Sequence, residues 1–219
     1  MGIVGSDGAF AEFVAVPVAN LHRVPESLPP EAAVFTEPLA AAFEILEQVH
    51  VRPGTAAIVL GDGKLGLLAA QVLQEAGAHV LAVGKHDDKL AILRRRGIET
   101  CLLDKAAGAS ADVVVEASGS AQGFGDAVRM TRPRGTLVLK STVAEPSRLN
   151  LAPLVINEIM LVGSRCGRFS PALRALEHRR IDVESLVSAR FPLHNGEQAL
   201  RMAAAAGVLK VLLEIGPAG

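Results

Sequence analysis

The feature that most constrains this chain is a glycine motif between two apolar segments. Ala56 to Leu60 is an apolar run typical of a buried strand, and Gly-Asp-Gly-Lys-Leu-Gly follows it at residues 61–66. Apolar residues then recur at helical spacing up to Leu73. In such a unit the first glycine allows a tight turn, the second lets the backbone approach a diphosphate, and the third lets helix and strand pack closely. The motif indicates a dinucleotide-binding turn, with the phosphates at the helix N-terminus. The alternative is a loop that only turns the chain.

All six residues of this turn are candidate coenzyme contacts: Gly61, Asp62, Gly63, Lys64, Leu65 and Gly66.

The end of the second predicted strand, His79 to Gly84, bears on the choice of coenzyme. A carboxylate at this place commonly binds the adenosine ribose of NAD, but here Lys85 and His86 follow Gly84. A small residue followed by two basic ones offers room and positive charge for a 2′-phosphate, so the sequence favours NADP(H) over NAD(H). Asp87 is predicted to cap the next helix. The alternative is that Lys85 and His86 are solvated and Asp87 reaches the ribose.

Composition narrows the class of protein. Half of the 219 residues are hydrophobic, and the formal net charge is −1, so nothing predicts binding to nucleic acid or to an anionic membrane. The N-terminal residues lack a signal-peptide pattern, no apolar stretch is long enough to span a bilayer, and we expect a cytoplasmic location. Cys101 and Cys166 are far apart in sequence, which fits a reducing compartment. The absence of tyrosine excludes short-chain dehydrogenases, which use a Tyr as general acid or base.

Strand and helix patterns alternate from about residue 55 to residue 170, which predicts an α/β fold with a doubly wound parallel sheet of about six strands. The predicted strands are Ala57–Leu60, His79–Gly84, Thr100–Leu103, Val113–Ala117, Thr136–Ser141 and Met160–Ser164. The predicted helices are Leu65–Ala76, Asp87–Arg96, Gln122–Thr131 and Leu151–Glu158. The basic run Arg94 to Arg96 is interpreted as a solvated helix end.

Both ends of the chain differ from this middle part. Ala9–Val16 and Leu21–Val24 are predicted as short strands, and one helical stretch is predicted from Leu28 to Val49. Ser188–Leu193, Gly196–Ala206 and Leu209–Ile215 are predicted as strand, helix and strand.

Four motifs carry a resemblance to a known family. In order they are Gly8-Ala9-Phe10-Ala11-Glu12-Phe13, Glu37-Pro38-Leu39-Ala40, the glycine turn at 61–66, and Glu116-Ala117-Ser118-Gly119. Together they resemble the later two-thirds of a zinc-type medium-chain dehydrogenase/reductase, of the alcohol and polyol dehydrogenase superfamily. The resemblance implies a Rossmann coenzyme domain at residues 42–178. It also implies that residues 1–41 and 179–219 belong to a partial, β-rich, GroES-like catalytic domain.

The resemblance also implies a zinc that polarises the substrate oxygen in full-length members. Their catalytic Cys, His-Glu pair and clustered cysteines precede the matched part, and this chain has none of them. Of the zinc neighbours only Glu37 remains, either as a vestigial site residue or as an ordinary helix residue. The six histidines show no ligand spacing and are interpreted mostly as surface or turn residues. One carboxylate cannot hold zinc, so we expect no metal here.

Further site residues follow from the matching motifs. Ser118 and Gly119 end the fourth strand and are expected near the nicotinamide ribose. Ser141 and Thr142 end the fifth strand, where the backbone from Lys140 onward is expected to meet the carboxamide. Lys210 matches a basic position that faces the coenzyme diphosphate in the family. Arg165 is interpreted as an exposed loop residue.

These expectations lead to two functional hypotheses. The first is the coenzyme-binding part of an NADP(H)-dependent alcohol or polyol dehydrogenase, which acts on a small alcohol or carbonyl substrate if the missing segment is supplied. The second is a non-catalytic dinucleotide-binding fragment or paralogue. A zinc-free quinone reductase is the second hypothesis among enzymes. The nucleotide turn of that class usually begins with paired alanines, whereas this chain has Gly61-Asp62-Gly63.

Two expectations concern the surface. Met160, Leu161 and Val162 of the last predicted strand of the sheet are expected to form a homodimer edge. Apolar surface is expected to be exposed around Phe10, Phe13 and Val14.

Overall fold

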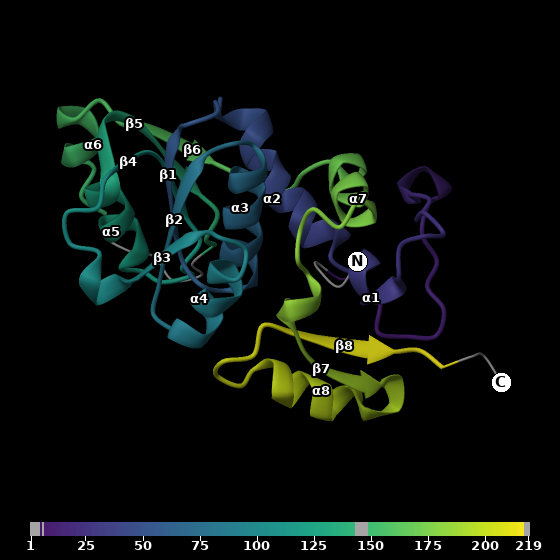
Figure 1. Cartoon of the computed structure of the whole chain (residues 1–219). Coiled ribbons are helices and arrows are strands. Elements are labelled where there is room, and N and C mark those ends of the chain that lie inside the picture. Colours follow the sequence, from purple (N-terminus) through teal and green to yellow (C-terminus); the bar gives the residue numbers. More distant parts are fainter. Residues whose placement is uncertain (1–4, 6, 143–148, 217–219) are drawn as a thin grey trace.

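The computed structural model describes residue 5, residues 7–142 and residues 149–216. The first four residues of the chain and residue 6, on which the signal-peptide expectation rested in part, lie outside this range. At the centre is a six-stranded parallel sheet with the order β3-β2-β1-β4-β5-β6 (Figure 1), which confirms the doubly wound α/β class. Its strands are β1 (Ala56–Leu60), β2 (His79–Gly84), β3 (Glu99–Leu102), β4 (Ala111–Glu116), β5 (Thr131–Leu139) and β6 (Met160–Gly163).

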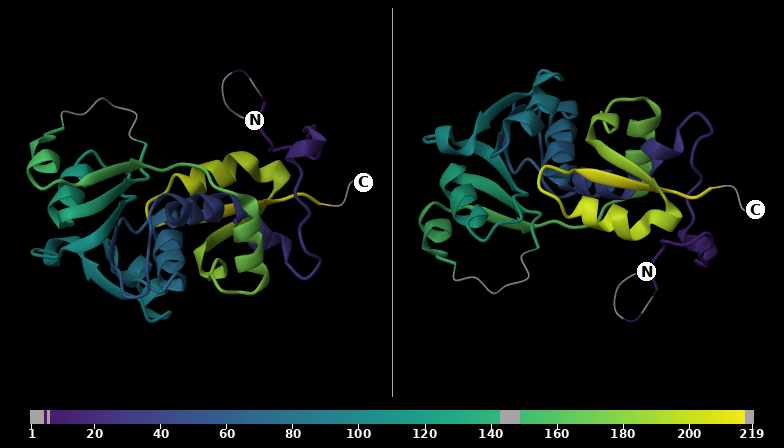
Figure 2. Two further views of the ribbon diagram at one scale, coloured as in Figure 1. Left: turned by 90° about the horizontal axis from the view of Figure 1, so that it is seen from above. Right: turned by 90° about the horizontal axis from the view of Figure 1, so that it is seen from below.

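Helices cover both faces of the sheet, as Figures 1 and 2 show. On one face lie α2 (Thr36–Gln48), α3 (Lys64–Glu75) and α4 (Asp87–Arg94), and on the other α5 (Gly123–Met130) and α6 (Ala152–Ile156). The side chains of β1 alternate between these layers: Ala57 and Val59 belong to the core under α2, α3 and α4, whereas Ile58 and Leu60 belong to the core under α5. Two-sided burial explains why these strands are continuous apolar runs.

The predicted helical stretch from Leu28 to Val49 is two helices. α1 (Pro30–Ala33) ends before Phe35, and α2 begins at Thr36. Pro38 explains the break, because proline has no amide hydrogen and fits a helix only in its first turn. α2 also crosses the limit predicted between the segments 1–41 and 42–178.

The two strands predicted near the N-terminus are wrong. The described residues of Ala9–Val16 and Leu21–Val24 form no strand, and between them lies only the 3-10 turn η1 (Val18–Asn20). Alternating apolar residues make a stable strand only beside a partner strand, and none of the described strands pairs with this segment. As expected, Phe10, Phe13 and Val14 are exposed, with Phe13 at 81%.

The C-terminal part forms a smaller unit with its own sheet. β7 (Val187–Pro192) and β8 (Lys210–Glu214) pair in parallel, and α8 (Gly196–Ala203) connects them, close to the predicted strand, helix and strand. Figure 1 shows this pair of strands apart from the six-stranded sheet. α7 (Phe169–Glu177), which packs against α2, is a helix that the sequence analysis does not predict.

α4 departs from one expectation at its start and, in part, from a second at its end. Asp87 does not cap the helix, since it is the first helical residue and its carboxylate accepts a hydrogen bond from Arg94 at 2.9 Å. The basic run is therefore only partly solvated. Arg96 also donates to the carbonyl of Arg180 at 2.6 Å. In the described part of the chain, no helix combines the length and the apolar character needed to cross a membrane.

Candidate functional site

The glycine turn joins β1 to α3 at the point where the strand order reverses, between β1 and β4. Ligands of doubly wound sheets bind at this switch point, outside the carboxyl ends of the strands. Gly61 has φ +127°, and a Cβ on it would lie 2.5 Å from the carbonyl oxygen of Ala117. A Cβ on Gly66 would overlap the carbonyl oxygen of Gly61. These two glycines are required for close packing of turn, helix and β4.

Gly63 differs from the other two glycines of the turn. A Cβ there would meet nothing within 4 Å, so this side of the turn is open. Gly63 is also the N-cap of α3, and the amides of the first helical turn, from Lys64 onward, have no intrahelical acceptor. An open backbone surface next to free amides at a helix N-terminus suits an anionic diphosphate.

The end of β2 is where the structure corrects the sequence analysis. The space beside the Cα of Gly84 is filled: a Cβ there would lie 2.5 Å from Oδ2 of Asp62. The small residue thus accommodates an aspartate from the glycine turn, not open room for a phosphate. A carboxylate therefore does stand at the end of β2, although it comes from β1–α3 and not from β2 itself.

Asp62 is held in place by the residues that follow Gly84. Its Oδ2 accepts hydrogen bonds from the backbone amides of Lys85 and His86, both at 2.6 Å, and lies 3.0 Å from Nδ1 of His86. Burial alone would raise the pKa of Asp62, but the hydrogen bonds from His86 and Lys85 outweigh burial and lower the pKa below 3.8. Asp62 is consequently a buried, ionised group at neutral pH, and the side chains of Lys85 and His86 are exposed.

The ends of β4 and β5 meet in the structure. The amide of Gly119 donates to Oγ of Ser141 at 2.8 Å, which brings these two predicted site residues together. The hydroxyl of Ser118 points back to the buried carboxylate of Glu116, at 2.5 Å, and so it anchors the loop. Thr142 is exposed next to Ser141.

Lys210 lies at the start of β8, far from the turn in sequence but near it in space. Its pKa is lowered from 10.5, first by burial and then by the positive charge of Lys64, while Glu37 acts in the opposite direction. Its Nζ is 5.8 Å from the centre of the Phe35 ring. Two lysines that repel each other beside the open turn would both be stabilised by a bound diphosphate. Glu37 is exposed in the first turn of α2.

Lys140 is a buried residue whose side chain the sequence analysis does not anticipate. Its ammonium donates to the carbonyl of Ala41 at 2.6 Å, to Oγ of Ser164 at 3.0 Å and to the carbonyl of Arg165 at 3.1 Å. All three protons are therefore used to join β5, α2 and the loop after β6. Arg165 itself is exposed, as expected. The sequence signal for this structural role is a lysine at the end of an apolar strand, because a buried lysine needs hydrogen-bond partners.

The donor set of a zinc site is not present in the described residues. Among them no three His, Cys, Asp or Glu side chains come together, whereas a catalytic zinc usually takes three protein ligands. All six histidines are exposed, and Cys101 and Cys166 are free thiols. The described residues do not fit a zinc ion, and no chemical step is derived through one.

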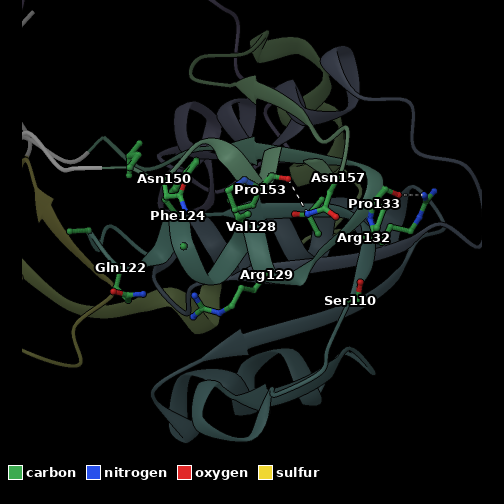
Figure 3. A pocket seen from close by; sticks show the side chains of 14 residues that line it. Ser110, Gln122, Phe124, Val128, Arg129, Arg132, Pro133, Asn150, Pro153 and Asn157 are labelled. Carbon is green, nitrogen blue, oxygen red and sulfur yellow. Dashed lines mark hydrogen bonds between the residues drawn. The ribbon is translucent and has the colours of Figure 1, made fainter. Parts of the chain in front are cut away.

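A cavity of about 500 Å³ lies elsewhere, between α5, the start of β5 and α6 (Figure 3). Phe124 and Val128 of α5 line it together with Arg132 and Asn157, and Asn157 donates to the carbonyl of Pro153 at 3.0 Å. None of the predicted site residues lines this cavity.

Several known proteins are similar to this chain. Sorbitol dehydrogenase of Halalkalibacterium halodurans is 27% identical over 94% of the chain, and L-threonine 3-dehydrogenase of Bacillus subtilis is 27% identical over 96%. The chain spans 65% of the first relative and 66% of the second. A solved protein of Sinorhizobium meliloti 1021, described as a zinc-binding dehydrogenase bound to NADP, is 25% identical. Its TM-score is 0.86, over 94% of this chain and 66% of that one.

A family model makes the assignment. It is described as zinc-binding dehydrogenase and matches residues 65–179, which include all but the first residue of α3 and the following strands up to β6. These residues are more than half of the chain, and they carry the helix of the glycine turn and the joined ends of β4 and β5. The chain therefore belongs to the zinc-binding dehydrogenase family.

Proposed function

We propose that this chain binds a nicotinamide dinucleotide at the glycine turn and forms the coenzyme-binding part of an oxidoreductase. The observation that carries the proposal is the turn itself: Gly61 and Gly66 pack against backbone, while Gly63 leaves an open surface next to the N-terminus of α3. The NADP bound by the Sinorhizobium relative supports it. When bound, the nicotinamide supplies hydride exchange with an alcohol or carbonyl carbon.

The chain's own residues would bind and orient this coenzyme. The α3 amides, Lys64 and Lys210 would hold the diphosphate, since two positive charges already lie close together there. Ser118, Gly119, Ser141 and Thr142 would line the nicotinamide side. Lys85 and His86, whose side chains are exposed, would meet a 2′-phosphate by charge alone, since Asp62 fills the space beside Gly84. This positive charge is what favours NADP(H) over NAD(H).

The wider organisation is part of the same proposal. Residues 42–178 would be the coenzyme domain, with 1–41 and 179–219 contributing to a catalytic domain. Its substrate would be a small alcohol or carbonyl compound. Two free thiols support a cytoplasmic location. A non-catalytic, dinucleotide-binding role is the second candidate, and Glu37, exposed on α2, would then have no part in catalysis.

Coenzyme titration of the purified chain tests the proposal. We expect saturable binding of NADPH with a Kd between about 1 µM and 1 mM. Lys210→Met should weaken it by about tenfold, because a charge-assisted hydrogen bond is lost. Arg201→Met, which removes one charge from exposed α8, is the matched control and should bind like the unmodified chain. If neither NADPH nor NADH bound to the chain, the proposal would be contradicted.

Turnover distinguishes the two candidate functions. Alcohol-dependent formation of NADPH, measured together with the zinc content, would assign catalysis to this chain. Binding without turnover would assign it the coenzyme-binding role alone.

A homodimer through β6 also belongs to the proposal. β6 is an edge strand of the sheet, and Met160 and Leu161 on it are 63% and 42% exposed, while Val162 packs against the core. We expect light scattering to show a dimer, and Leu161→Lys to yield monomers because a charge would be placed in the interface. A monomeric unmodified chain would contradict this assembly.

A further inference from the structure

We propose that Asp62 and His86 form a pair that makes the choice between NADP(H) and NAD(H) depend on the protonation of His86. In this pair Asp62 is a positioning residue, and His86 is the group that contacts the 2′-phosphate. The inference rests on the proposed function, because it concerns the same coenzyme site. If Lys85 and His86 acted only as positive charges, they would need no partner such as Asp62. The pair adds a way to select between the two coenzymes.

Asp62 determines which hydrogen-bond donors of the loop after β2 stay free. The side chain of Asp62 is 10% exposed, and that of His86 is 50% exposed. Asp62 occupies the backbone amides of both Lys85 and His86, so these amides are not available to a phosphate. The side chains of Lys85 and His86, together with the amides of the first turn of α4, are the donors that remain free here.

The two ring nitrogens of His86 have different surroundings. Nδ1 lies 3.1 Å from Oδ1 and 3.0 Å from Oδ2 of Asp62, so this nitrogen faces the carboxylate. Nε2, on the opposite side of the ring, makes no hydrogen bond within the described part of the chain. A neutral imidazole has one N–H and can donate to only one acceptor, whereas an imidazolium donates from both nitrogens. The ring can therefore bridge the Asp62 carboxylate and a phosphate only when it is protonated.

The ribose of NAD(H) makes a different demand. Its 2′-hydroxyl can both donate and accept, so a neutral ring satisfies it as well as a charged one. The hydrogen bonds that lower the pKa of Asp62 keep its carboxylate ionised over the range in which histidine titrates. Raising the pH through this range should weaken NADPH binding and leave NADH binding nearly unchanged.

Other charges near the pair enter the same balance. Lys85 precedes His86 in the chain, Asp87 follows it at the start of α4, and Arg94 forms an ion pair with Asp87 at 2.9 Å. The charge of Lys105, from the 3-10 turn η2 (Leu103–Lys105) after β3, also acts on Asp87. These groups do not contact Nδ1, which leaves Asp62 as the partner of the ring.

The experiment measures the Kd of NADPH and of NADH for the full chain between about pH 6 and pH 8.5, where histidine titrates. We expect the Kd of NADPH to rise about tenfold across this range, as a charge-assisted hydrogen bond is lost, and that of NADH to change less than about twofold. His86→Gln keeps a neutral donor and should remove most of the difference. This variant also accounts for the titration of the 2′-phosphate itself, which has a pKa near 6.

Asp62→Asn tests the positioning role. An amide of the same shape keeps an acceptor for the loop, and it can also donate to Nδ1, so that a neutral ring can donate from Nε2 to the phosphate; the Kd of NADPH should then change less with pH than in the unmodified chain. His86→Gln alters an exposed ring, and it decides the question alone where Asp62→Asn does not fold. An NADPH-to-NADH affinity ratio with the same pH profile in the unmodified chain and in His86→Gln would overturn the inference while leaving coenzyme binding intact. Failure of both coenzymes to bind would overturn the proposed function and the inference with it.

Discussion

Replacing Gly61 by alanine is expected to lower the free energy of unfolding by about 3–5 kcal/mol. Two causes act together. The φ of +127° is rarely accessible to a residue with a side chain, and the new Cβ would lie 2.5 to 2.9 Å from backbone atoms of Ala117 and Ser118. Backbone at the end of β4 cannot move aside as a flexible side chain would. Urea unfolding followed by circular dichroism measures the loss.

Gly63→Ala is the matched control for this prediction. Gly63 has φ −76°, and a Cβ on it meets nothing within 4 Å, so stability should change by less than about 1 kcal/mol. The same Cβ would occupy the surface assigned to the diphosphate, and NADPH binding should weaken by tenfold or more. Equal loss of stability in the two variants would show that the turn does not have the packing described here.

Lys140→Met is expected to cost about 2–4 kcal/mol of stability. Methionine nearly fills the volume of the lysine side chain, but it leaves the carbonyls of Ala41 and Arg165 and the hydroxyl of Ser164 without their shared donor. Lys105→Met removes one exposed lysine of η2 and serves as the control, with a change within about 0.5 kcal/mol. Equal stability of the two variants would contradict the structural role of Lys140.

The effect of Lys140 should also depend on pH. Burial lowers the pKa of Lys140 below 10.5, and the charges of Glu44, Cys166 and Glu37 only partly oppose this. Between the folded pKa and 10.5 the unfolded chain holds a proton that the folded chain has released, so the stability of the unmodified chain rises with pH. The difference in unfolding free energy between the unmodified chain and Lys140→Met should therefore grow as the pH approaches 10.5. A difference that shrinks over this interval would argue against a buried amine.

The sheet could be predicted from sequence because its signals are local. Each strand is buried on both faces and is therefore an apolar run, and the glycine turn occurs between such a run and an amphipathic helix. The N-terminal strands were predicted by the same alternation and are wrong, because pairing depends on a neighbouring strand that alternation does not reveal. Pro38, the third residue of α2, is the local signal for the break before this helix.

The same contrast between local signals and contacts of distant segments holds for the site. Gly61, Gly63 and Gly66 act within one turn, and their separate roles follow from spacing. Asp62 is predicted as part of the turn, but its carboxylate accepts hydrogen bonds from the amides that follow β2. Only the packing of β1 beside β2 creates this contact. Lys140 was considered for its backbone alone, since nothing local shows that its side chain reaches α2. Contacts between distant segments were the part that sequence could not supply.

The close fit between Gly84 and Asp62 has a consequence for how this family can diversify. A side chain at position 84 and the present conformation of Asp62 exclude each other, because a Cβ on residue 84 would lie 2.5 to 2.8 Å from side-chain atoms of Asp62. An acidic group can thus reach this spot by either of two routes, from the strand end or from the turn, and in this chain it comes from the turn. Homologous sequences should consequently exchange the two residues in concert, and a coenzyme preference inferred from position 84 alone would be misread wherever position 62 is acidic.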